Sequence, residues 1–196
     1  MSPKPADPKV RMALIETAAE LIAAEGPAHL SLRKLARAVG TSTMAVYTHF
    51  GGMDELRREV RREGFARLYR RVAAVPRTDD PVADLVLVGQ AYYVNAVTNP
   101  NLYRAMFMEG PIGPDDAGIG RDAFDQLVEA VQRCVDAGRF AGDATEMALQ
   151  IWSTAHGVVA LELAHMLDPD VARSTLQAAG ANLVRSFAAA ASLPRQ

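Results

Sequence analysis

The sequence predicts an all-α protein of about nine helices. Apolar residues recur at helical spacing along most of the chain, and no convincing segment alternates between polar and apolar residues as a half-buried strand does. Of the 196 residues, 49% are apolar and 22% are charged, which is an ordinary globular composition. Capping residues, glycines and prolines mark where the individual helices begin and end.

The first helix is predicted over residues 9–25. Gly26 and Pro27 follow it directly, and such a pair ends a helix. Its apolar side chains are three or four residues apart, so they share one face that can turn toward a core. This apolar set consists of Val10, Leu14, Ala18, Leu21 and Ile22.

Two short helices and a long one follow. Ser31 is placed to cap a helix over residues 32–39, and Gly40 supplies the left-handed residue that ends it. A third short helix runs through Tyr47, with Thr41 or Ser42 as its cap. Beyond it, a long charged helix is predicted over about residues 54–75, with arginines and glutamates at spacings that allow ion pairs.

The later helices are marked by their first residues. An Asx side chain caps free amides, and proline is tolerated at the first helical position; three such pairs are Asp80-Pro81, Asn99-Pro100 and Asp168-Pro169. Asp143 and Glu146 form a capping box for a helix that runs to about Leu167, and the last helix spans about residues 171–191. Residues 110–120 hold four glycines and two prolines and are predicted to be a loop.

Charge divides the chain into a basic and an acidic part. Residues 1–75 carry 13 Lys and Arg against 8 Asp and Glu, whereas residues 76–196 carry 8 against 15. A positive segment favours approach to a phosphate backbone, and an acidic one disfavours it. We therefore predict a domain that faces DNA over residues 1–52, a connecting helix over 53–75, and a second domain over 76–196 that faces away from DNA.

The segment from Ser31 to Leu56 has the spacing of a helix-turn-helix, because two short helices are joined by about three residues. In that motif the second helix enters the major groove. Ala45, Val46 and Phe50 would face inward, while outward residues meet base edges and flanking residues meet phosphates. The predicted DNA-binding residues are Ser31, Leu32, Arg33, Thr41, Ser42, Thr43, Met44, Tyr47, Thr48 and His49.

Residues 10–56 resemble the DNA-binding domain of the TetR family of transcriptional regulators. The resemblance rests on the small-residue turn, the run Tyr47-Thr48-His49-Phe50, and the Asp54-Glu55-Leu56 opening of the fourth helix. It implies a homodimer that binds double-stranded DNA at a pseudo-palindromic operator, represses transcription and is released by a small hydrophobic effector. In similar proteins the fourth helix transmits ligand binding to the DNA-binding heads.

One position departs from the family pattern. Met53 stands where the family usually has a lysine that contacts a DNA phosphate. Each remaining candidate for that contact is also compatible with a solvated helix face; the candidates are Arg33, Lys34, Arg37 and the pair Arg57 and Arg58.

In the C-terminal part, Trp152, His156 and Gly157 resemble the Trp-x-x-x-His-Gly class of ligand-binding domains within the same family. Trp152 and His156 share one helical face, and His156 has either a hydrogen-bonded place in the core or a ligand contact. Bulky apolar side chains with a few polar tips suit a small-molecule pocket. The predicted pocket residues are Tyr92, Tyr93, Met106, Phe107, Phe124, Leu127, Trp152 and His156.

The last two predicted helices carry small, apolar faces that can pack closely. By resemblance to the family these faces form a two-fold dimer interface, and a helix-turn-helix needs a partner for its second half-site. Packing within one chain is the alternative. The predicted interface residues are Gly157, Ala160, Leu161, Ala164, Leu176, Ala179, Gly180, Leu183, Val184 and Phe187.

Two other functions remain open from the sequence. A helical enzyme or metal-binding protein would use Glu162 and His165, an i,i+3 pair of the kind that di-metal bundles need twice, but the sequence holds one such pair and no phosphate-binding glycine loop or HExxH motif. A DNA-binding protein without a ligand would fill its C-terminal core completely. We expect no enzyme activity, no cofactor and no metal.

The sequence favours a cytoplasmic location. Residues 1–9 hold three prolines and no apolar stretch, so a secretory signal is not expected. No window approaches the roughly 20 apolar residues that a membrane span requires. Cys134 is the single cysteine and is expected to be a small buried residue.

Overall fold

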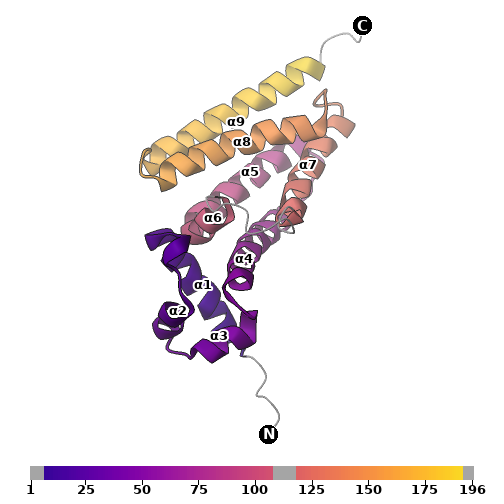
Figure 1. Cartoon of the computed structure of the whole chain (residues 1–196). Helices are drawn as coiled ribbons and strands as arrows, with labels where there is room; N and C mark the ends of the chain where they lie inside the picture. The colour runs from indigo at the N-terminus through magenta and orange to yellow at the C-terminus, as the bar shows by residue number, and fades with distance from the viewer. Residues whose placement is uncertain (1–6, 108–117, 192–196) are drawn as a thin grey trace. The chain divides into compact units, whose positions relative to one another are not determined.

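The computed structural model describes residues 7–107 and 118–191, and within them it contains nine α-helices, one short 3-10 helix and no strand (Figure 1). The predicted all-α fold is therefore confirmed. The elements are α1 (Pro8–Glu25), η1 (Pro27–His29), α2 (Leu32–Val39), α3 (Thr43–Phe50), α4 (Met53–Ala73), α5 (Pro81–Thr98), α6 (Pro100–Phe107), α7 (Arg121–Asp136), α8 (Ala144–Leu163) and α9 (Pro169–Ala191).

The chain divides into two compact units. The first comprises residues 1–67 and 99–120, and the second comprises residues 68–98 and 121–196. The division crosses α4 between Arg67 and Leu68, so this helix contributes to both units. It also separates α5 from α6, which follows α5 after a single residue, Asn99.

The first unit closes a core between α1, α2, α3, the first part of α4, and α6. The fully buried side chains of Leu14, Leu35, Val46 and Val60 come from α1, α2, α3 and α4. Leu102 of α6 joins the same core. Since α6 lies some forty residues farther along the chain than α4, its place in this unit is decided by packing and not by chain order.

The close approach of α4 and α6 depends on a glycine. A Cβ atom at Gly64 of α4 would lie 2.6 Å from both Cγ and Sδ of Met106, which is shorter than non-bonded atoms tolerate. Phe65 of α4 packs edge-on against Phe107 of α6, with 5.4 Å between ring centroids. The two helices are thus in direct contact along this stretch.

The second unit packs α5, α7, α8 and α9 around a separate core. Val131 and Cys134 of α7 are fully buried there, and Phe140 packs edge-on against Phe187 of α9. The thiol of Cys134 donates to the carbonyl oxygen of Pro81 at 3.3 Å. Burial raises the pKa of Cys134 to about 11, so the thiol behaves as the small buried residue that the sequence predicts.

Most helix starts follow the predicted capping residues. Helices α5, α6 and α9 begin at Pro81, Pro100 and Pro169, and the carboxylate of Asp143 accepts from the backbone N–H of Glu146 at 2.8 Å at the start of α8. These starts were predictable because a cap and its partners lie within three residues of each other.

Helix ends differ more from the predictions. Helix α8 stops at Leu163 instead of about Leu167, because His165 adopts a left-handed backbone with φ of 58°. Helix α4 stops at Ala73 instead of about Val75, and α3 continues to Phe50 instead of ending near Tyr47. Residues 110–117 of the predicted loop lie outside the described residues.

Candidate functional site

The turn between α2 and α3 has the geometry of a helix-turn-helix. Gly40 ends α2 with a left-handed backbone, φ 74° and ψ 33°, and the N–H of Thr41 donates to the carbonyl oxygen of Ala36 at 2.8 Å. The hydroxyl of Ser42 then accepts from the N–H of Ala45 at 3.1 Å and caps α3. Three residues therefore connect α2 to α3, and the hydrogen bonds at both helix ends hold the turn in place.

Helix α3 is held by one face and presents the other to solvent. Val46 is fully buried, Phe50 is 5% exposed and Ala45 is half-buried, so these three residues form its packed face. On the open face Met44 is 70% exposed and Tyr47 is 50% exposed. Five of the predicted DNA-binding residues are exposed on this face or at its N-cap, namely Ser42, Thr43, Met44, Tyr47 and Thr48.

The other predicted DNA-binding residues flank α3 or begin α2. Ser31 and Arg33 are exposed, and the Ser31 hydroxyl accepts from the N–H of Lys34 at 3.3 Å. Thr41 and His49 are half-buried. Leu32 is half-buried and packs against the core of the first unit, so its backbone N–H, at the start of α2, is the group it can offer to a phosphate.

Met53 stands where the family usually has a lysine. Met53 is the first residue of α4 and packs against the core. Of the basic residues that could replace a lysine there, Lys34 forms an ion pair with Glu25, and Arg58 lies 3.2 Å from Glu55. The set also includes Arg33 and Arg37, which are exposed on α2 and form no ion pair within the described residues.

Other arginines of α4 form ion pairs within the first unit. Arg67 lies 2.7 Å from Glu16 of α1 and 2.8 Å from Glu63 of its own helix, and it donates to the amide oxygen of Asn99 at 2.9 Å. Arg62 lies 2.6 Å from Glu55, and the hydrogen bond from Arg62 holds the pKa of Glu55 below its usual value. These contacts agree with the interpretation of α4 as a charged, ion-paired helix.

The structure separates the predicted pocket residues into two groups. Met106 and Phe107 belong to the first unit, where Met106 is 5% exposed and Phe107 packs against Phe65 and Tyr103. The remaining six belong to the second unit. Sequence patterns could not make this distinction, because the helices α5 and α6 are adjacent in the chain but pack in different units.

Four of the predicted pocket residues of the second unit contact one another in a row, in the order Phe124, Trp152, His156 and Tyr92. The ring of Trp152 lies 5.8 Å from that of Phe124 and 5.9 Å from that of His156, and a hydrogen bond of 3.1 Å links the Tyr92 hydroxyl to Nδ1 of His156. Tyr92 is 9% exposed, and Phe124, Trp152 and His156 are half-buried. Their contacts with one another favour a packing role.

Two further predicted pocket residues are also engaged by the protein. Leu127 is half-buried and packs against the core of the second unit. Tyr93 is 8% exposed, and burial together with the neighbouring Glu162 carboxylate raises the pKa of its phenol.

The Glu162 and His165 pair, on which the metal-binding alternative depends, does not lie on one helix face. Glu162 has a partner in Tyr93, and His165 lies beyond the end of α8. Within the described residues no group of three metal-binding side chains is found.

A cavity of about 180 Å³ lies elsewhere in the second unit, among the end of α4, the connection to α5, and helices α5 and α7. None of the predicted pocket residues lines it. Its polar residues include Gln126, Glu129 and Arg133 of α7. In the sequence these look like the solvated face of an amphipathic helix, and nothing local distinguishes them from exposed polar residues.

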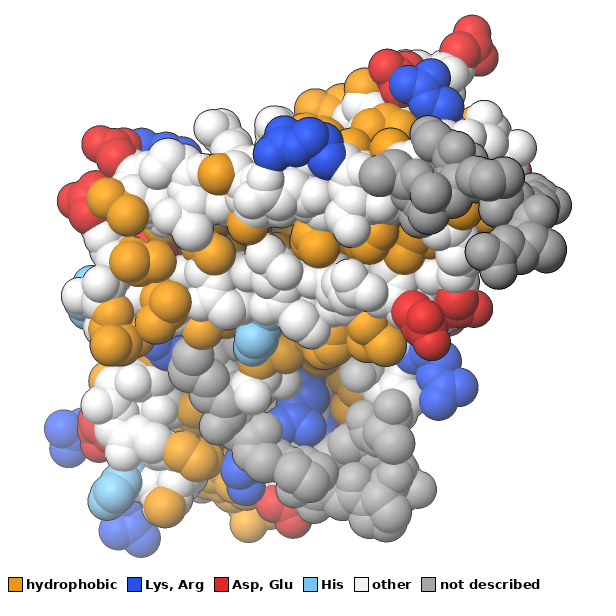
Figure 2. All heavy atoms as spheres, turned by 90° about the horizontal axis from the view of Figure 1, so that it is seen from above, with side chains coloured by type: hydrophobic (Ala, Val, Ile, Leu, Met, Phe, Trp, Pro, Cys, Tyr) orange, Lys and Arg blue, Asp and Glu red, His pale blue; other side chains and the backbone are white. Residues whose placement is uncertain are grey.

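The predicted dimer residues lie on α8, at its C-cap Ala164 and on α9, and three of the ten are exposed in the protomer. Leu161 is 41% exposed, and Gly157 and Ala164 are exposed. Figure 2, which looks onto these two helices, has a band of hydrophobic side chains along them. Of the other predicted residues, Phe187 is buried at 6% exposure in the core, and those that are half-buried are Ala160, Leu176, Ala179, Gly180, Leu183 and Val184.

The two glycines of this face are not required by packing within the protomer. A Cβ atom built at Gly157 or at Gly180 would meet nothing within 4 Å. A Cβ atom could therefore be added at either position without a clash in the isolated chain. A separate question is whether the protein could cross a membrane. None of the helices that the structure describes is long and apolar enough to do so.

Comparison with known proteins covers both units. Residues 14–60 match the family model of bacterial regulatory proteins of the tetR family. Residues 85–187, more than half of the chain, match the model of tetracyclin repressor-like C-terminal domains. The resemblance to the Trp-His-Gly class stays a prediction, because the C-terminal match is to this other model.

Individual relatives agree with the family models. An uncharacterized HTH-type transcriptional regulator of Mycobacterium tuberculosis is 30% identical over 161 residues, which are 81% of this chain and 72% of that protein. A solved structure of a protein of unknown function from Rhodococcus sp. RHA1 is 26% identical with a TM-score of 0.79, covering 96% of this chain and 100% of the other.

A second solved structure shares the fold. A bacterial regulatory protein in the tetR family from Rhodococcus RHA1 is 22% identical with a TM-score of 0.77, covering 92% of this chain and 98% of the other. The matches extend over the helix-turn-helix and the C-terminal unit alike. The chain therefore belongs to the TetR family of bacterial transcriptional regulators.

Proposed function

We propose that a homodimer of this protein binds a pseudo-palindromic operator through α3 and represses transcription until a small molecule binds the second unit. The observation that carries the proposal is the open face of α3. Val46 and Phe50 anchor the helix in the core, while Met44 and Tyr47 are among its most exposed side chains. A soluble head gains nothing from exposing a large apolar side chain, whereas a major-groove surface can use one.

The chemistry of this face suits base edges. The Met44 side chain can contact thymine methyl groups, and the hydroxyls of Thr43 and Tyr47 can donate to or accept from bases or phosphates. The Thr48 hydroxyl already donates to the carbonyl oxygen of Met44 at 2.9 Å, so it meets DNA as an acceptor. The side chains on this face of α3 therefore suit binding in the major groove, but they do not predict which base sequence is bound.

We assign the phosphate contacts that Met53 cannot make to Arg33 and Arg37. Both guanidinium groups are exposed and form no ion pair within the described residues, so binding DNA would break no existing ion pair of theirs. Lys34 and Arg58 would first have to leave Glu25 and Glu55. The N-terminus of α2 adds partial positive charge beside Arg33.

The dimer would form through α8 and α9. A helix-turn-helix dimer needs its two recognition helices about 34 Å apart, one turn of DNA. The open space at Gly157 and Gly180, and the exposed Leu161, support contact with a second copy of the chain. Phe187 is excluded from the proposed interface because Phe140 already covers it.

The effector would act by binding the DNA-competent and DNA-incompetent states with unequal affinity. Helix α4 is continuous across the boundary of the two units, so a displacement of its last turns can be passed along the helix toward the first unit. The proposal requires no catalytic step, and it requires a location in the cytoplasm with the chromosome. A small hydrophobic molecule that enters the second unit is the expected effector.

The test is binding to a DNA fragment from beside the protein's own gene, measured by fluorescence anisotropy over a range of salt concentrations. Tyr47→Ala and Met44→Ala should each weaken specific binding about tenfold or more, since a good base contact contributes roughly 1–3 kcal/mol. Arg33→Ala and Arg37→Ala should weaken binding to all sequences and lower the slope of log K against log[salt] by about one each.

Met166→Ala is the matched control. Met166 is 72% exposed and Met44 is 70% exposed, but Met166 follows α8 in the second unit. This control should bind DNA as the wild type does. If Met44→Ala and Tyr47→Ala bound a specific fragment as tightly as Met166→Ala, α3 would not be the recognition helix.

A further inference from the structure

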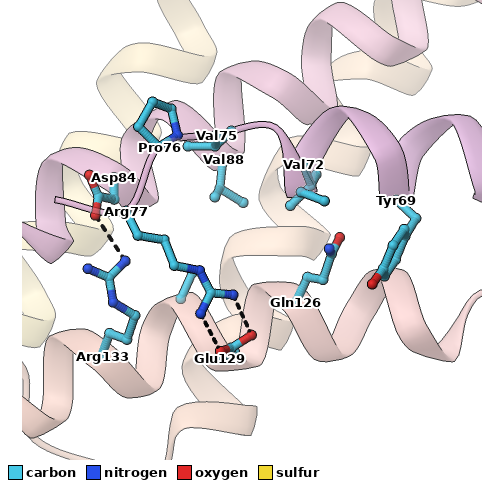
Figure 3. A pocket seen from close by; sticks show the side chains of 12 residues that line it. Tyr69, Val72, Val75, Pro76, Arg77, Asp84, Val88, Gln126, Glu129 and Arg133 are labelled. Atoms are coloured by element: carbon cyan, nitrogen blue, oxygen red, sulfur yellow. Dashed lines mark hydrogen bonds and ion pairs between the residues drawn. The ribbon is translucent and has the colours of Figure 1, made fainter.

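The cavity of the second unit has a charged mouth. Arg77, in the connection after α4, donates through both terminal nitrogens to the Glu129 carboxylate of α7 at 2.7 and 2.8 Å. The two side chains are 63% and 52% exposed. Figure 3 shows this pair reaching across from the connection to α7. One positive and one negative charge thus offset each other at the entrance.

A second ion pair lies deeper in the cavity. Arg133 lies 2.9 Å from the Asp84 carboxylate, whose side chain is 3% exposed. Asp84 also accepts from the backbone N–H and the hydroxyl of Thr78, each at 2.8 Å, and these bonds together with Arg133 hold its pKa below the usual value. Asp84 is therefore ionised and fully paired at neutral pH, and the cavity as a whole carries no net charge.

The opposite side of the cavity has apolar walls, one amide and the phenol of Tyr69. Val72 of α4 and Val88 of α5 are each 8% exposed and form its walls. The side chain of Gln126 points from α7 toward α4, beside Tyr69 (Figure 3). Oε1 of Gln126 is buried and has no hydrogen-bond partner. An unsatisfied buried acceptor is costly, so this group marks where a donor is expected.

We propose that this cavity is the effector site and that its ligand is an uncharged, single-ring compound whose N–H or O–H donates to Oε1 of Gln126. The proposal rests on the proposed function for the consequence of binding, but not for binding itself. The volume of the cavity suits a ligand with one ring. A cavity of about 150 Å³ accommodates benzene, and this one measures about 180 Å³. The ring would lie against Val72 and Val88.

Charge excludes ionised ligands. An anion would approach the carboxylates of Glu129 and Asp84, whose arginine partners are already engaged, and a cation would approach the two guanidinium groups. Either ion would lose its hydration without gaining a free partner. A neutral ligand loses less hydration free energy on entry, and its N–H or O–H can donate to Oε1 of Gln126.

The test is calorimetric titration of the full-length protein with three probes that share one ring: benzamide, benzoate and benzylamine. Benzamide should bind with a Kd in the millimolar range or below, as a ligand of its size allows, and the two charged probes should bind at least about tenfold more weakly. Gln126→Leu should lower the affinity for benzamide about fivefold. The same variant should bind toluene as tightly as the wild type does, or more tightly.

Two controls keep the test specific. Gln132→Leu makes the same chemical change on the same helix, at an exposed residue whose amide donates to Asp136 at 2.8 Å, and it should bind benzamide as the wild type does. Ala73→Phe, at an exposed position that lines the cavity, should abolish benzamide binding, whereas Ala74→Phe at the exposed neighbouring position should not.

The outcomes separate the site from the proposed function. Equal affinity for benzoate and benzamide, no binding of benzamide at its solubility limit, or the same benzamide affinity in Gln126→Leu and wild type would overturn the site. Operator binding is measured on the same samples. If saturating benzamide bound as expected but left operator affinity unchanged, the site would stand and release by the ligand would fail.

Discussion

His156 illustrates how burial of one side chain makes the stability of the second unit depend on pH. The ring is half-buried between Trp152 and the Tyr92 hydroxyl. Burial lowers the pKa of His156, because the charged imidazolium loses hydration there. The folded protein therefore binds this proton less readily than the unfolded chain does.

The sign of the effect follows from this difference. The contribution of neutral His156 to stability is fully present above the ordinary histidine pKa of about 6.5 and is lost progressively as the pH falls below it. His156→Gln keeps a hydrogen-bonding group for Tyr92 but removes the titration. The midpoint of thermal unfolding should therefore fall less between pH 7.5 and pH 5 in this variant than in the wild type.

A control for this measurement is His165→Asn. His165 is exposed, and asparagine tolerates its left-handed backbone. This variant should lose stability with acid as the wild type does. Parallel loss of stability in His156→Gln and wild type would assign the pH dependence to other groups.

At the scale of elements, the contact between α4 and α6 decides how the first unit is completed. Leu102 and Ala105 of α6 enter the core of the helix-turn-helix, and Gly64 allows Met106 to lie directly against α4. Arg67 adds bonds to Glu16 and Asn99. Helix α6 is thus an integral part of the DNA-binding unit.

Gly64→Val should destabilise the protein by about 1–3 kcal/mol, because the added side chain overpacks the contact with Met106. Urea denaturation gives the free energy of unfolding. Gly89→Val is the matched control, since Gly89 lies within α5 and a Cβ atom there meets nothing within 4 Å. Valine is a slightly better helix former than glycine, so the control should be neutral or mildly stabilising. Equal stabilities for the two variants would contradict the close approach.

At the scale of the whole molecule, operator binding should depend on the second copy of the chain. A single recognition helix makes few base contacts, and a dimer adds a second half-site without any new contact type. The surface proposed for dimerisation carries few charges on the open face of α8, where Gly157 and Leu161 are exposed.

Leu161→Glu should weaken the dimer about a hundredfold, because the new carboxylate would be buried without a partner at the interface. Sedimentation velocity at micromolar protein would then detect monomers, and operator affinity would fall with it. Val86→Glu is the control, because Val86 is 48% exposed on α5 and Leu161 is 41% exposed on α8. A dimeric Leu161→Glu protein would place the interface elsewhere.

The sequence by itself determined the fold class, most helix starts and which face of α3 is exposed. These features depend on interactions within one or two helical turns. Ser42 caps α3 through a residue three positions away, and the exposure of Met44 and Tyr47 follows from the helical period once Val46 and Phe50 are recognised as apolar anchors. Local hydrogen bonding and periodicity therefore specify them.

Only the tertiary structure decided which helices share a unit and where the second unit is hollow. Met106 and Phe107 have the bulk expected of pocket residues, yet they pack in the first unit, and Phe187 is covered by Phe140. The ion pair between Asp84 and Arg133 joins residues 49 positions apart. Such contacts depend on how separate helices pack, and no spacing within one helix encodes them.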